Sequence, residues 1–342
     1  MPSGNLTLSL AIFAVAALLV AVFGIRMSRL ADRLADATGL GEAFVGAVFM
    51  GGTTSLPGIV AVVTSAGDGY PAIAFSTAVG GIAAQTAFLA LADLTYRETN
   101  LEHAAASVPN MLSGALLMSL LALLLLAING PDVAWLGVHP VTPLLVIGYL
   151  AGMRLVYRAH ERPMWQPRIT RATRVDQPGP GSGTDGERVG PLVAQFVVTG
   201  GVVAVAGWGL GRSGEVIAAQ TGLSDSFVGG ILVAVSTSLP ELVTALAAVR
   251  IRALTLAVSG IIGGNAFDTL FAAMGDVAYR DGSIYHALTP REPALLSLAL
   301  LMTGVLLLGL LHRERQGPAN IGFESALLLI LYAVGVVYLS LA

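Results

Sequence analysis

Two acidic residues lie within apolar stretches that are each long enough to cross a membrane. Glu241 follows a proline in STSLPELVTAL, and Asp268 lies in GGNAFDTLF, in the next apolar stretch. A carboxylate near the centre of a bilayer costs about 2.5 to 3.5 kcal/mol, and such acids commonly have a function. Carboxylate oxygens suit hard cations such as Na+, Ca2+ and Mg2+. We therefore expect both acids to bind a metal cation.

A duplicated motif, Thr-Ser-Leu-Pro, offers neutral oxygen atoms beside these acids. It occupies residues 54–57 and 237–240, and Glu241 follows the second copy. Proline has no N–H and clashes with the carbonyl one turn earlier, so each copy should break its helix. In hydrocarbon the released carbonyls need a partner, which an ion or water can supply. The hydroxyl candidates for cation binding are Thr54, Ser55, Thr237 and Ser238, with Thr53 and Ser236 as secondary candidates.

The apolar stretch after each motif provides a second wall for this site. Asn265 and Asp268 are three residues apart, which places them on adjacent faces of one helix. The corresponding positions in the first half are Ile82 and Gln85. Each stretch contains a glycine pair, at residues 80–81 and 263–264, which lets membrane helices approach closely. We expect Gln85 to bind the cation and regard Asn265 as a secondary candidate.

The composition predicts a protein that crosses the membrane several times. The 342 residues are 55% hydrophobic and only 11% charged. Cysteine is absent, which excludes disulfides, thiolate metal sites and cysteine nucleophiles. The sequence also contains no nucleophile–base motif. We expect a protein that is not an enzyme, that has no cofactor and no nucleic-acid partner, and that interacts with inorganic cations and the lipid bilayer.

Ten apolar stretches predict an all-α membrane protein with ten transmembrane helices. The predicted spans are residues 6–25, 43–66, 71–94, 106–128, 138–157, 191–210, 226–248, 253–276, 293–311 and 321–341. Between the fifth and sixth spans lies DQPGPGSGTDGERVG, which is too polar and too rich in glycine and proline to fold. The expected units are a five-helix repeat at 1–157, a flexible linker at 158–190 and a second five-helix repeat at 191–342.

The two halves are similar in sequence. Residues 38–65 align without a gap on 221–248, and 80–97 align at the same offset on 263–280; 20 of these 46 positions are identical. Because each half contains five spans, an odd number, the second half must enter the membrane from the opposite face. This predicts an inverted repeat, an arrangement in which transporters bind their substrates near the midplane.

The basic residues predict the orientation of the chain. All 18 are arginines, and 15 of them fall on one side of the predicted spans. Only Arg212, Arg280 and Arg291 fall on the other side. The positive-inside rule then makes the linker cytoplasmic and both termini extracytoplasmic, in an integral protein of the cytoplasmic (plasma) membrane.

A second duplicated motif, Asp-x-x-Tyr-Arg, ends the third and eighth predicted spans. It places Asp93 four residues before Arg97, and Asp276 four residues before Arg280. Opposite charges at this spacing on a helix can form a local ion pair. We therefore expect a structural role for these residues.

The chain resembles the cation/calcium exchanger superfamily, which includes the sodium/calcium exchangers. The resemblance spans nearly the whole chain and rests on the two Thr-Ser-Leu-Pro segments, on Glu241 and on Asp268. It implies two central glutamates, one from each repeat, completed by an Asn or Asp from the following helix. Calcium would compete there with sodium or protons. Here the glutamate of the first repeat is replaced by Gly58, and the amide partner is Gln85.

These observations predict a secondary active cation antiporter that exchanges Ca2+ for Na+ or H+ by alternating access at a midplane site. The absence of an acid at Gly58 leaves two carboxylates, which balance one divalent ion or two monovalent ones. Two alternatives therefore stay open. The chain could be a monovalent Na+/H+ exchanger, or a transport-inactive regulatory membrane paralogue.

Overall fold

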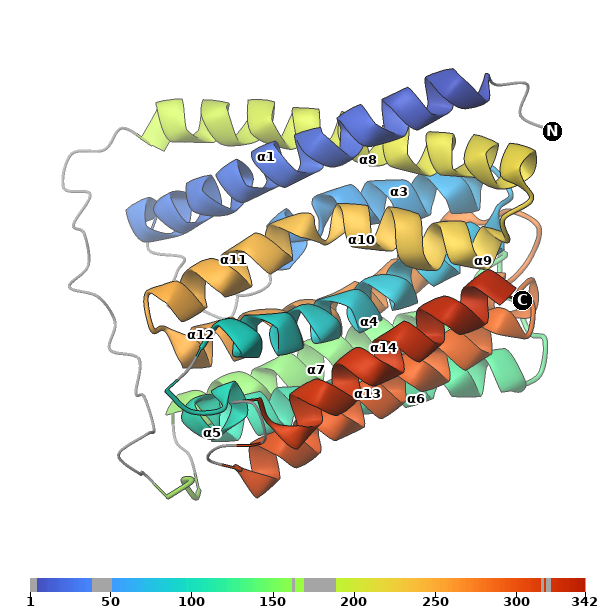
Figure 1. Ribbon diagram of the computed structural model, residues 1–342. Coiled ribbons are helices and arrows are strands. Elements are labelled where there is room, and N and C mark those ends of the chain that lie inside the picture. Colours follow the sequence, from blue (N-terminus) through green and yellow to red (C-terminus); the bar gives the residue numbers. More distant parts are fainter. Residues whose placement is uncertain are drawn as a thin grey trace.

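The protein folds as a bundle of long helices (Figure 1). The computed structural model describes residues 5–38, 51–96, 98–161, 164–168, 189–314, 317 and 321–341. These residues contain no β-strand, and their single β-bridge joins Trp135 to Val138 at a turn. The predicted all-α membrane fold is confirmed.

The helices occur in pairs whose bounds differ by a constant offset. The first set comprises α1 (Leu6–Thr38), α3 (Leu56–Gly67), α4 (Pro71–Thr95), α5 (Leu101–Ala105), α6 (Val108–Asn129) and α7 (Val141–Glu161). The second set comprises α8 (Val189–Thr221), α9 (Asp225–Phe227), the π-helical η1 (Val228–Val233), α10 (Ala234–Thr237), α11 (Leu239–Arg250), α12 (Leu254–Ala278), the 3-10 turn η2 (Ile284–His286), α13 (Arg291–His312) and α14 (Phe323–Leu341). Both bounds differ by 183 residues between α1 and α8, α3 and α11, α4 and α12, and α6 and α13. The offset is that of the sequence repeat.

Seven of the described helices are long and apolar enough to cross a membrane. A bent pair, Asp225–Thr237 with Leu239–Arg250, would form an eighth span. α3 has only 12 residues, and the first part of the predicted span 43–66 lies outside the described residues. α7 is helical over 21 residues but is not among the seven. The count of ten spans therefore stays a prediction.

The two longest helices, α1 and α8, lie side by side along one face of the bundle and run in opposite directions (Figure 1). Each has 33 residues, so both are longer than the predicted spans. The prediction for α1 stopped before Arg26, where the apolar stretch ends. The helix continues because arginine is a good helix former and needs no apolar surroundings beyond the bilayer. Apolar length therefore underestimated helix length here.

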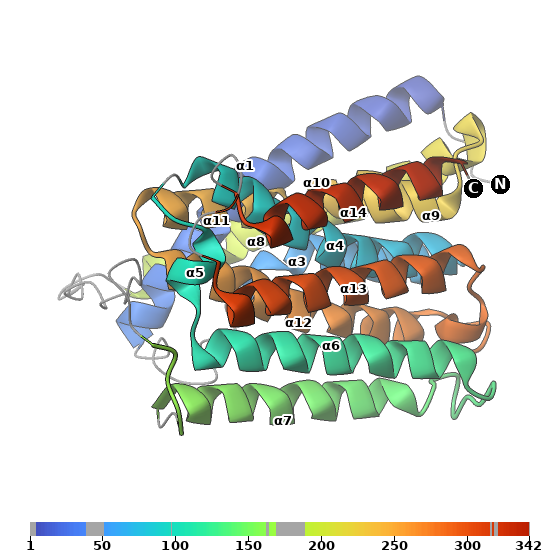
Figure 2. The same cartoon turned by 60° about the horizontal axis from the view of Figure 1, so that its bottom comes forward.

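The centre of the bundle consists of α4 and α12, which contact each other and are largely buried. On one side they pack against α3 and the broken helix formed by η1, α10 and α11. On the other side lie α6, α7 and α13, and α14 packs against α4 and α13 (Figure 2). This arrangement shields the polar residues of α4 and α12 from lipid.

Both Thr-Ser-Leu-Pro segments interrupt their helices, as predicted. In the second half, α10 ends at Thr237 and α11 begins at Leu239, with a bend of 46° between the two parts. In the first half, a helical turn ends at Thr54 and α3 begins at Leu56. Each new helix has its proline in the first turn, where the missing N–H has no helical partner to lose.

The duplicated aspartates bind backbone groups of the following segment. Asp276 accepts hydrogen bonds from the Ile284 N–H at 3.0 Å, the His139 N–H at 2.8 Å and the Thr142 hydroxyl at 2.6 Å. The predicted ion pair with Arg280 is therefore wrong, because backbone and hydroxyl donors occupy this carboxylate. In the first half Asp93 accepts from the N–H of the residue eight positions later, as Asp276 does. Its predicted partner, Arg97, lies outside the described residues.

Candidate cation site

Asp268 lies buried at the centre of a polar cluster between the two halves. Its Oδ1 accepts a hydrogen bond of 2.7 Å from the Ser55 hydroxyl. Its Oδ2 accepts one of 2.6 Å from the Gln85 amide. Both donors come from the first half of the chain. Asp268 thus connects α12 to α4 and to the break before α3.

The Gln85 amide binds two oxygen atoms of the second half. Its Nε2 donates to Asp268 and, at 3.3 Å, to the Ser238 hydroxyl. Its Oε1 accepts no hydrogen bond from the described residues. Gln85 and Asp268 occupy corresponding positions, as do Ser55 and Ser238. Each serine therefore binds the central polar residue of the opposite half, which gives the cluster an approximate two-fold arrangement.

Glu241 provides the second buried carboxylate of the cluster. It lies in the first turn of α11, directly after the break, and only 7% of it is exposed. The positive end of the helix dipole favours a negative charge at this position. The carboxylate interacts with the Thr54 hydroxyl and with the charge of Asp268. Its Oε2 has no hydrogen-bond partner among the described residues.

Two glycines keep the space beside these groups open. A Cβ atom at Gly81 would lie 3.5 Å from the Ser238 hydroxyl and 4.0 Å from Oδ2 of Asp268. A Cβ atom at Gly264 would lie 3.5 Å from Oε1 of Gln85. Any larger side chain at either position would occupy space next to these oxygen atoms. The glycines therefore leave room beside the buried polar cluster of α4 and α12.

Three of the predicted hydroxyl ligands bind carbonyls of their own helices. Thr237 donates to Val233 and Ala234, each at 3.0 Å, and Ser236 donates to Leu232 at 2.7 Å. Thr54 donates to the carbonyl of Gly51 at 3.2 Å, although it also interacts with Glu241. Thr53, the other secondary candidate, is buried in the same turn. In this structure Ser55 and Ser238 are the hydroxyls that bind the central residues.

Asn265 lies beside the cluster and joins the two central helices. Its Nδ2 donates to the Thr86 hydroxyl at 3.0 Å, and its Oδ1 has no partner among the described residues. Thr86 was not among the predicted site residues. Thr269 occupies the equivalent position in the second repeat. This duplication of a buried polar residue was a signal that could have identified Thr86.

Aromatic side chains fill the space next to the first break. A Cβ atom at Gly58 would lie 2.6 Å from Cε2 of Phe271, so the ring occupies the space that a side chain at this position would need. The ring of Phe267 similarly lies 3.4 Å from the Cβ positions of Gly51 and Gly52. Comparison of the two repeats predicted the missing acid at Gly58 but not these rings. Their spacing of four residues on one helix was the available signal.

The cluster offers two carboxylates, one amide oxygen and several hydroxyls. The described residues contain no group of three or more His, Cys, Asp or Glu side chains placed to hold a metal. A Ca2+ ion takes six to eight oxygen ligands, so neutral oxygens and water would have to complete its shell. Two carboxylates can balance one divalent cation or two monovalent ions.

Comparisons with known proteins agree on the family and the fold. The family model described as "Sodium/calcium exchanger protein" matches residues 8–151 and 191–341, on either side of the predicted linker. No curated protein matches this chain in sequence.

Three solved structures share this architecture, and two of them are described as exchangers. The H+/Ca2+ exchanger CAX is 15% identical with a TM-score of 0.69, over 97% of this chain and 85% of that one. Native YfkE is 16% identical with a TM-score of 0.65, over 96% and 92%. The sodium-calcium exchanger NCX_Mj, soaked with Na+ and without Ca2+, is 18% identical with a TM-score of 0.59, over 97% and 99%. The chain belongs to the sodium/calcium exchanger family, within the cation/calcium exchanger superfamily.

Proposed function

We propose that this protein is a secondary active antiporter that exchanges Ca2+ for Na+ or H+ by alternating access at the cluster around Asp268 and Glu241. The observation that carries the proposal is the meeting of two buried carboxylates with polar groups of both halves, beside two broken helices. Family membership supports cation antiport in general. Cations and protons would compete for the same carboxylate oxygens, which couples their opposite movements.

In this proposal Gln85 changes its role when a cation binds. Its Nε2 now lies between Oδ2 of Asp268 and the Ser238 hydroxyl, where it satisfies two oxygen atoms. An arriving cation would take over these oxygens, and rotation of the amide would present the unpartnered Oε1 to the ion. Asp268 and Glu241 supply the charge. The neutral ligands are Ser55, Ser238 and Gln85, with Thr54 and Thr237 contributing when their hydroxyls turn away from their own helices.

The proposed architecture has ten transmembrane helices in two inverted five-helix repeats, at 1–157 and 191–342. It is supported by the constant offset of the helix bounds and by the antiparallel course of α1 and α8 (Figure 1). The start of α1 and the end of α14 lie at one end of the bundle, and the segments flanking 158–190 lie at the other (Figure 1). With the arginine distribution, this favours a cytoplasmic linker and extracytoplasmic termini in the plasma membrane.

Alternating access would involve α1 and α8, which contact the prolines of the two breaks. A Cβ atom at Gly207 of α8 would lie 2.5 Å from the carbonyl oxygen of Pro57. A Cβ atom at Gly24 of α1 would lie 2.5 Å from Cγ of Pro240. Each outer helix therefore packs through a glycine on the broken helix of the opposite half. Small residues at such contacts allow the close approach seen between membrane helices.

A monovalent Na+/H+ exchanger is the second candidate. It is favoured by the Phe271 ring, which fills the space beside Gly58 where the first half lacks an acid. The two remaining carboxylates would then trade Na+ for protons without a divalent ion.

Ion fluxes in liposomes containing the purified protein separate these functions. Ca2+ uptake would be measured under an outward Na+ gradient and, separately, under an outward H+ gradient, with internal pH recorded and protein-free liposomes as the control. We expect Ca2+ uptake under one gradient, and that gradient identifies the counter-ion. Sodium-linked pH changes without Ca2+ movement would replace Ca2+ exchange with Na+/H+ exchange. Silence in every assay would contradict transport altogether.

A further inference from the structure

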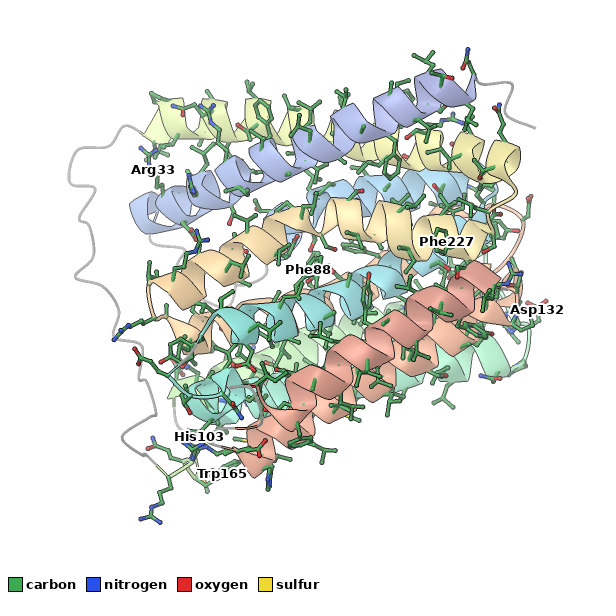
Figure 3. All side chains as sticks on the ribbon, in the orientation of Figure 1. Arg33, Phe88, His103, Asp132, Trp165 and Phe227 are labelled. Atoms are coloured by element: carbon green, nitrogen blue, oxygen red, sulfur yellow. The ribbon has the colours of Figure 1, made fainter. Side chains whose placement is uncertain are left out.

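Three buried acids meet at the end of the bundle where α4 ends. Asp93 belongs to α4, Glu102 to α5 and Glu324 to the first turn of α14, and none has any exposed surface. The neighbouring His103 marks this end in Figure 3, whereas Asp132 marks the opposite end. The acids lie outside the candidate cation site and its proposed mechanism.

Both carboxylate oxygens of Asp93 accept a hydrogen bond, whereas most carboxylate oxygens of Glu102 and Glu324 accept none from the described residues. The N–H groups of Leu101 at 2.7 Å and Gly322 at 3.4 Å bind the two oxygens of Asp93. Glu102 accepts only one long hydrogen bond, of 3.5 Å, from Ser325. Its Oε2 and both oxygens of Glu324 have no donor among the described residues. These two carboxyl groups instead interact with each other.

Two glycines form a cradle for the Glu324 side chain. A Cβ atom at Gly309 of α13 would lie 2.5 Å from Cγ of Glu324. A Cβ atom at Gly322 would overlap its carboxyl group. The carboxyl group is therefore enclosed by α13 and by the segment before α14. It cannot turn to solvent without moving one of them.

The charged side chains that the structure describes near Glu102 and Glu324 do not form an ion pair with either acid. Arg313 donates to the carbonyls of His103 at 3.3 Å and Arg168 at 2.7 Å, and its own carbonyl contacts the His103 ring at 2.7 Å. Glu314 binds the N–H of Phe323 and adds further negative charge near Glu324. Among the described residues no ion pair involves the buried acids; Arg97 lies outside them.

At the opposite end of the molecule, the repeat-related positions have the same aspartate but no pair of glutamates. Asp276 corresponds to Asp93, and Tyr285 stands at the position of Glu102. The hydroxyl of Thr142, which corresponds to Ser325, binds Asp276 at 2.6 Å and the hydroxyl of Tyr285 at 3.1 Å. The fold therefore does not require an acid pair at this place.

We propose that Glu102 and Glu324 bind one proton between them, and that this proton holds α5 against the start of α14. A protonated carboxyl group donates a hydrogen bond to the other carboxylate, which provides the missing donor. Without the proton, two like charges would face each other in a buried site. The ligand is a proton and not a metal ion, because the carboxyl groups contact each other and the described residues form no three-residue metal group.

The protonation state of this pair should affect stability in a defined direction. Burial raises the pKa of Glu102 well above its usual range, and the charges of Asp93 and Glu324 raise it further. An acid whose pKa is raised by folding stabilises the fold at low pH, and this contribution is lost as pH rises through the raised pKa. The contact between α5 and α14 should therefore loosen at high pH.

Loosening would reach the central helix that carries Gln85. Leu101 and Gly322, which flank the acid pair in sequence, both donate to Asp93 near the end of α4. Gln85 lies eight residues earlier on the same helix, about 12 Å along its axis. Protonation at this end is thus mechanically connected to the cation site, although the proton site does not depend on the transported ion.

Hydrogen exchange of the backbone amides tests the proposal. Exchange in residues 98–107 and 321–328 would be followed against pH, with the intrinsic pH dependence of amide exchange removed. In wild type we expect both segments to exchange about tenfold faster after the pair has lost its proton than before, because the contact between α5 and α14 then opens more often. Glu102→Gln and Glu324→Gln should each abolish this rise, because the carboxamide donates permanently to the remaining carboxylate. The control Glu98→Gln changes a half-exposed acid that pairs with Arg252, and it should keep the wild-type midpoint.

Several outcomes would overturn the proposal. A wild-type profile without a rise in these segments would do so even if neither glutamine variant folds. An unchanged midpoint in both glutamine variants would also contradict it. Protection of the segments by added Ca2+ in an Asp268→Asn background would replace the proton with a metal ligand.

Discussion

The two halves of the candidate cation site share a backbone design but differ in charge. The second half contributes Glu241 and Asp268, whereas the corresponding positions of the first half are Gly58 and Gln85. The ring of Phe271 occupies the space beside Gly58. At the positions of Glu241 and Asp268, the first half therefore has a glycine covered by an aromatic ring and an amide. Negative charge is concentrated in one half, and the other contributes neutral polar groups.

The two halves also differ in the sizes of the side chains that pack beside the breaks. Phe267 packs against Gly51 and Gly52 of the first break. At the repeat offset, Phe267 corresponds to Ala84, and the two glycines correspond to Ala234 and Val235. The large Phe267 thus faces two glycines, whereas the corresponding positions of the other half combine the small Ala84 with residues larger than glycine, Ala234 and Val235. Compensation of this kind preserves packing density while the two sites diverge.

The largest effect is expected for Asp268→Asn, which removes charge from the charged half. The asparagine keeps an oxygen that can accept from Ser55, so the fold should survive. Ca2+ uptake should fall to background because one carboxylate cannot balance a divalent ion. Gradient-driven uptake in liposomes measures the change, with a monodisperse size-exclusion profile as the control for folding. Uptake at the wild-type rate would show that charge at this position is dispensable.

Gly58→Glu restores the missing acid and tests why it is absent. Alone it should destabilise the protein by about 1–3 kcal/mol, because its Cβ would overlap the Phe271 ring. Combined with Phe271→Ala it should fold better and bind Ca2+ roughly tenfold more tightly, equivalent to ~1.4 kcal/mol. Thermal unfolding with and without Ca2+ measures both effects. Equal stability of the single and double variants would mean that the ring does not limit this position.

The two serines compare the halves directly. Ser55 donates to the carboxylate of Asp268 at 2.7 Å, whereas Ser238 accepts from the neutral Gln85 amide at 3.3 Å. Hydrogen bonds to charged groups contribute about 1.5–3 kcal/mol and neutral ones about 0.5–1.5 kcal/mol. Ser55→Ala should therefore raise the KM for Ca2+ more than Ser238→Ala does. The dependence of uptake on Ca2+ concentration gives both values, and the reverse order would contradict this difference.

The smallest effect is expected for Ser236→Ala. Its hydroxyl binds the carbonyl of Leu232 in its own helix, and such bonds add little to helix stability. The rate and KM of uptake should stay within about twofold of wild type. A larger loss would indicate that Ser236 becomes a ligand in another state of the transport cycle.

Sequence patterns predicted the parts of this structure that depend on local chemistry. The Thr-Ser-Leu-Pro segments predicted both helix breaks, because proline removes a backbone donor wherever it occurs. The repeat identified Gln85 as the counterpart of Asp268. Gln85 and Asp268 can contact each other if both lie near the axis that relates the two halves. Whether they do depends on the lengths and rotamers of the two side chains, which the sequence does not give.

Local sequence patterns could not predict contacts between residues that are far apart in the sequence. The i, i+4 rule predicted an ion pair for Asp276 and Arg280, but the carboxylate binds His139 and Thr142, more than 130 residues away. The spacing of Phe267 and Phe271 places both rings on one face of α12, but it does not show which glycines of the first half they contact. Glu102 and Glu324 drew no prediction because their counterparts, Tyr285 and Val141, are not acids. Their significance depends on packing between α5 and α14.

The most direct measurement of the central claim is Ca2+ uptake by Glu241→Gln, compared with wild type under the gradient that drives transport. Asp132→Asn, which changes an exposed acid between α6 and α7 at one end of the bundle (Figure 3), serves as the matched control. If the carboxylates of the second half carry the cation, uptake should disappear in Glu241→Gln and persist in Asp132→Asn, and Ca2+ should no longer stabilise the first variant. Uptake by Glu241→Gln at the wild-type rate would contradict the proposed site.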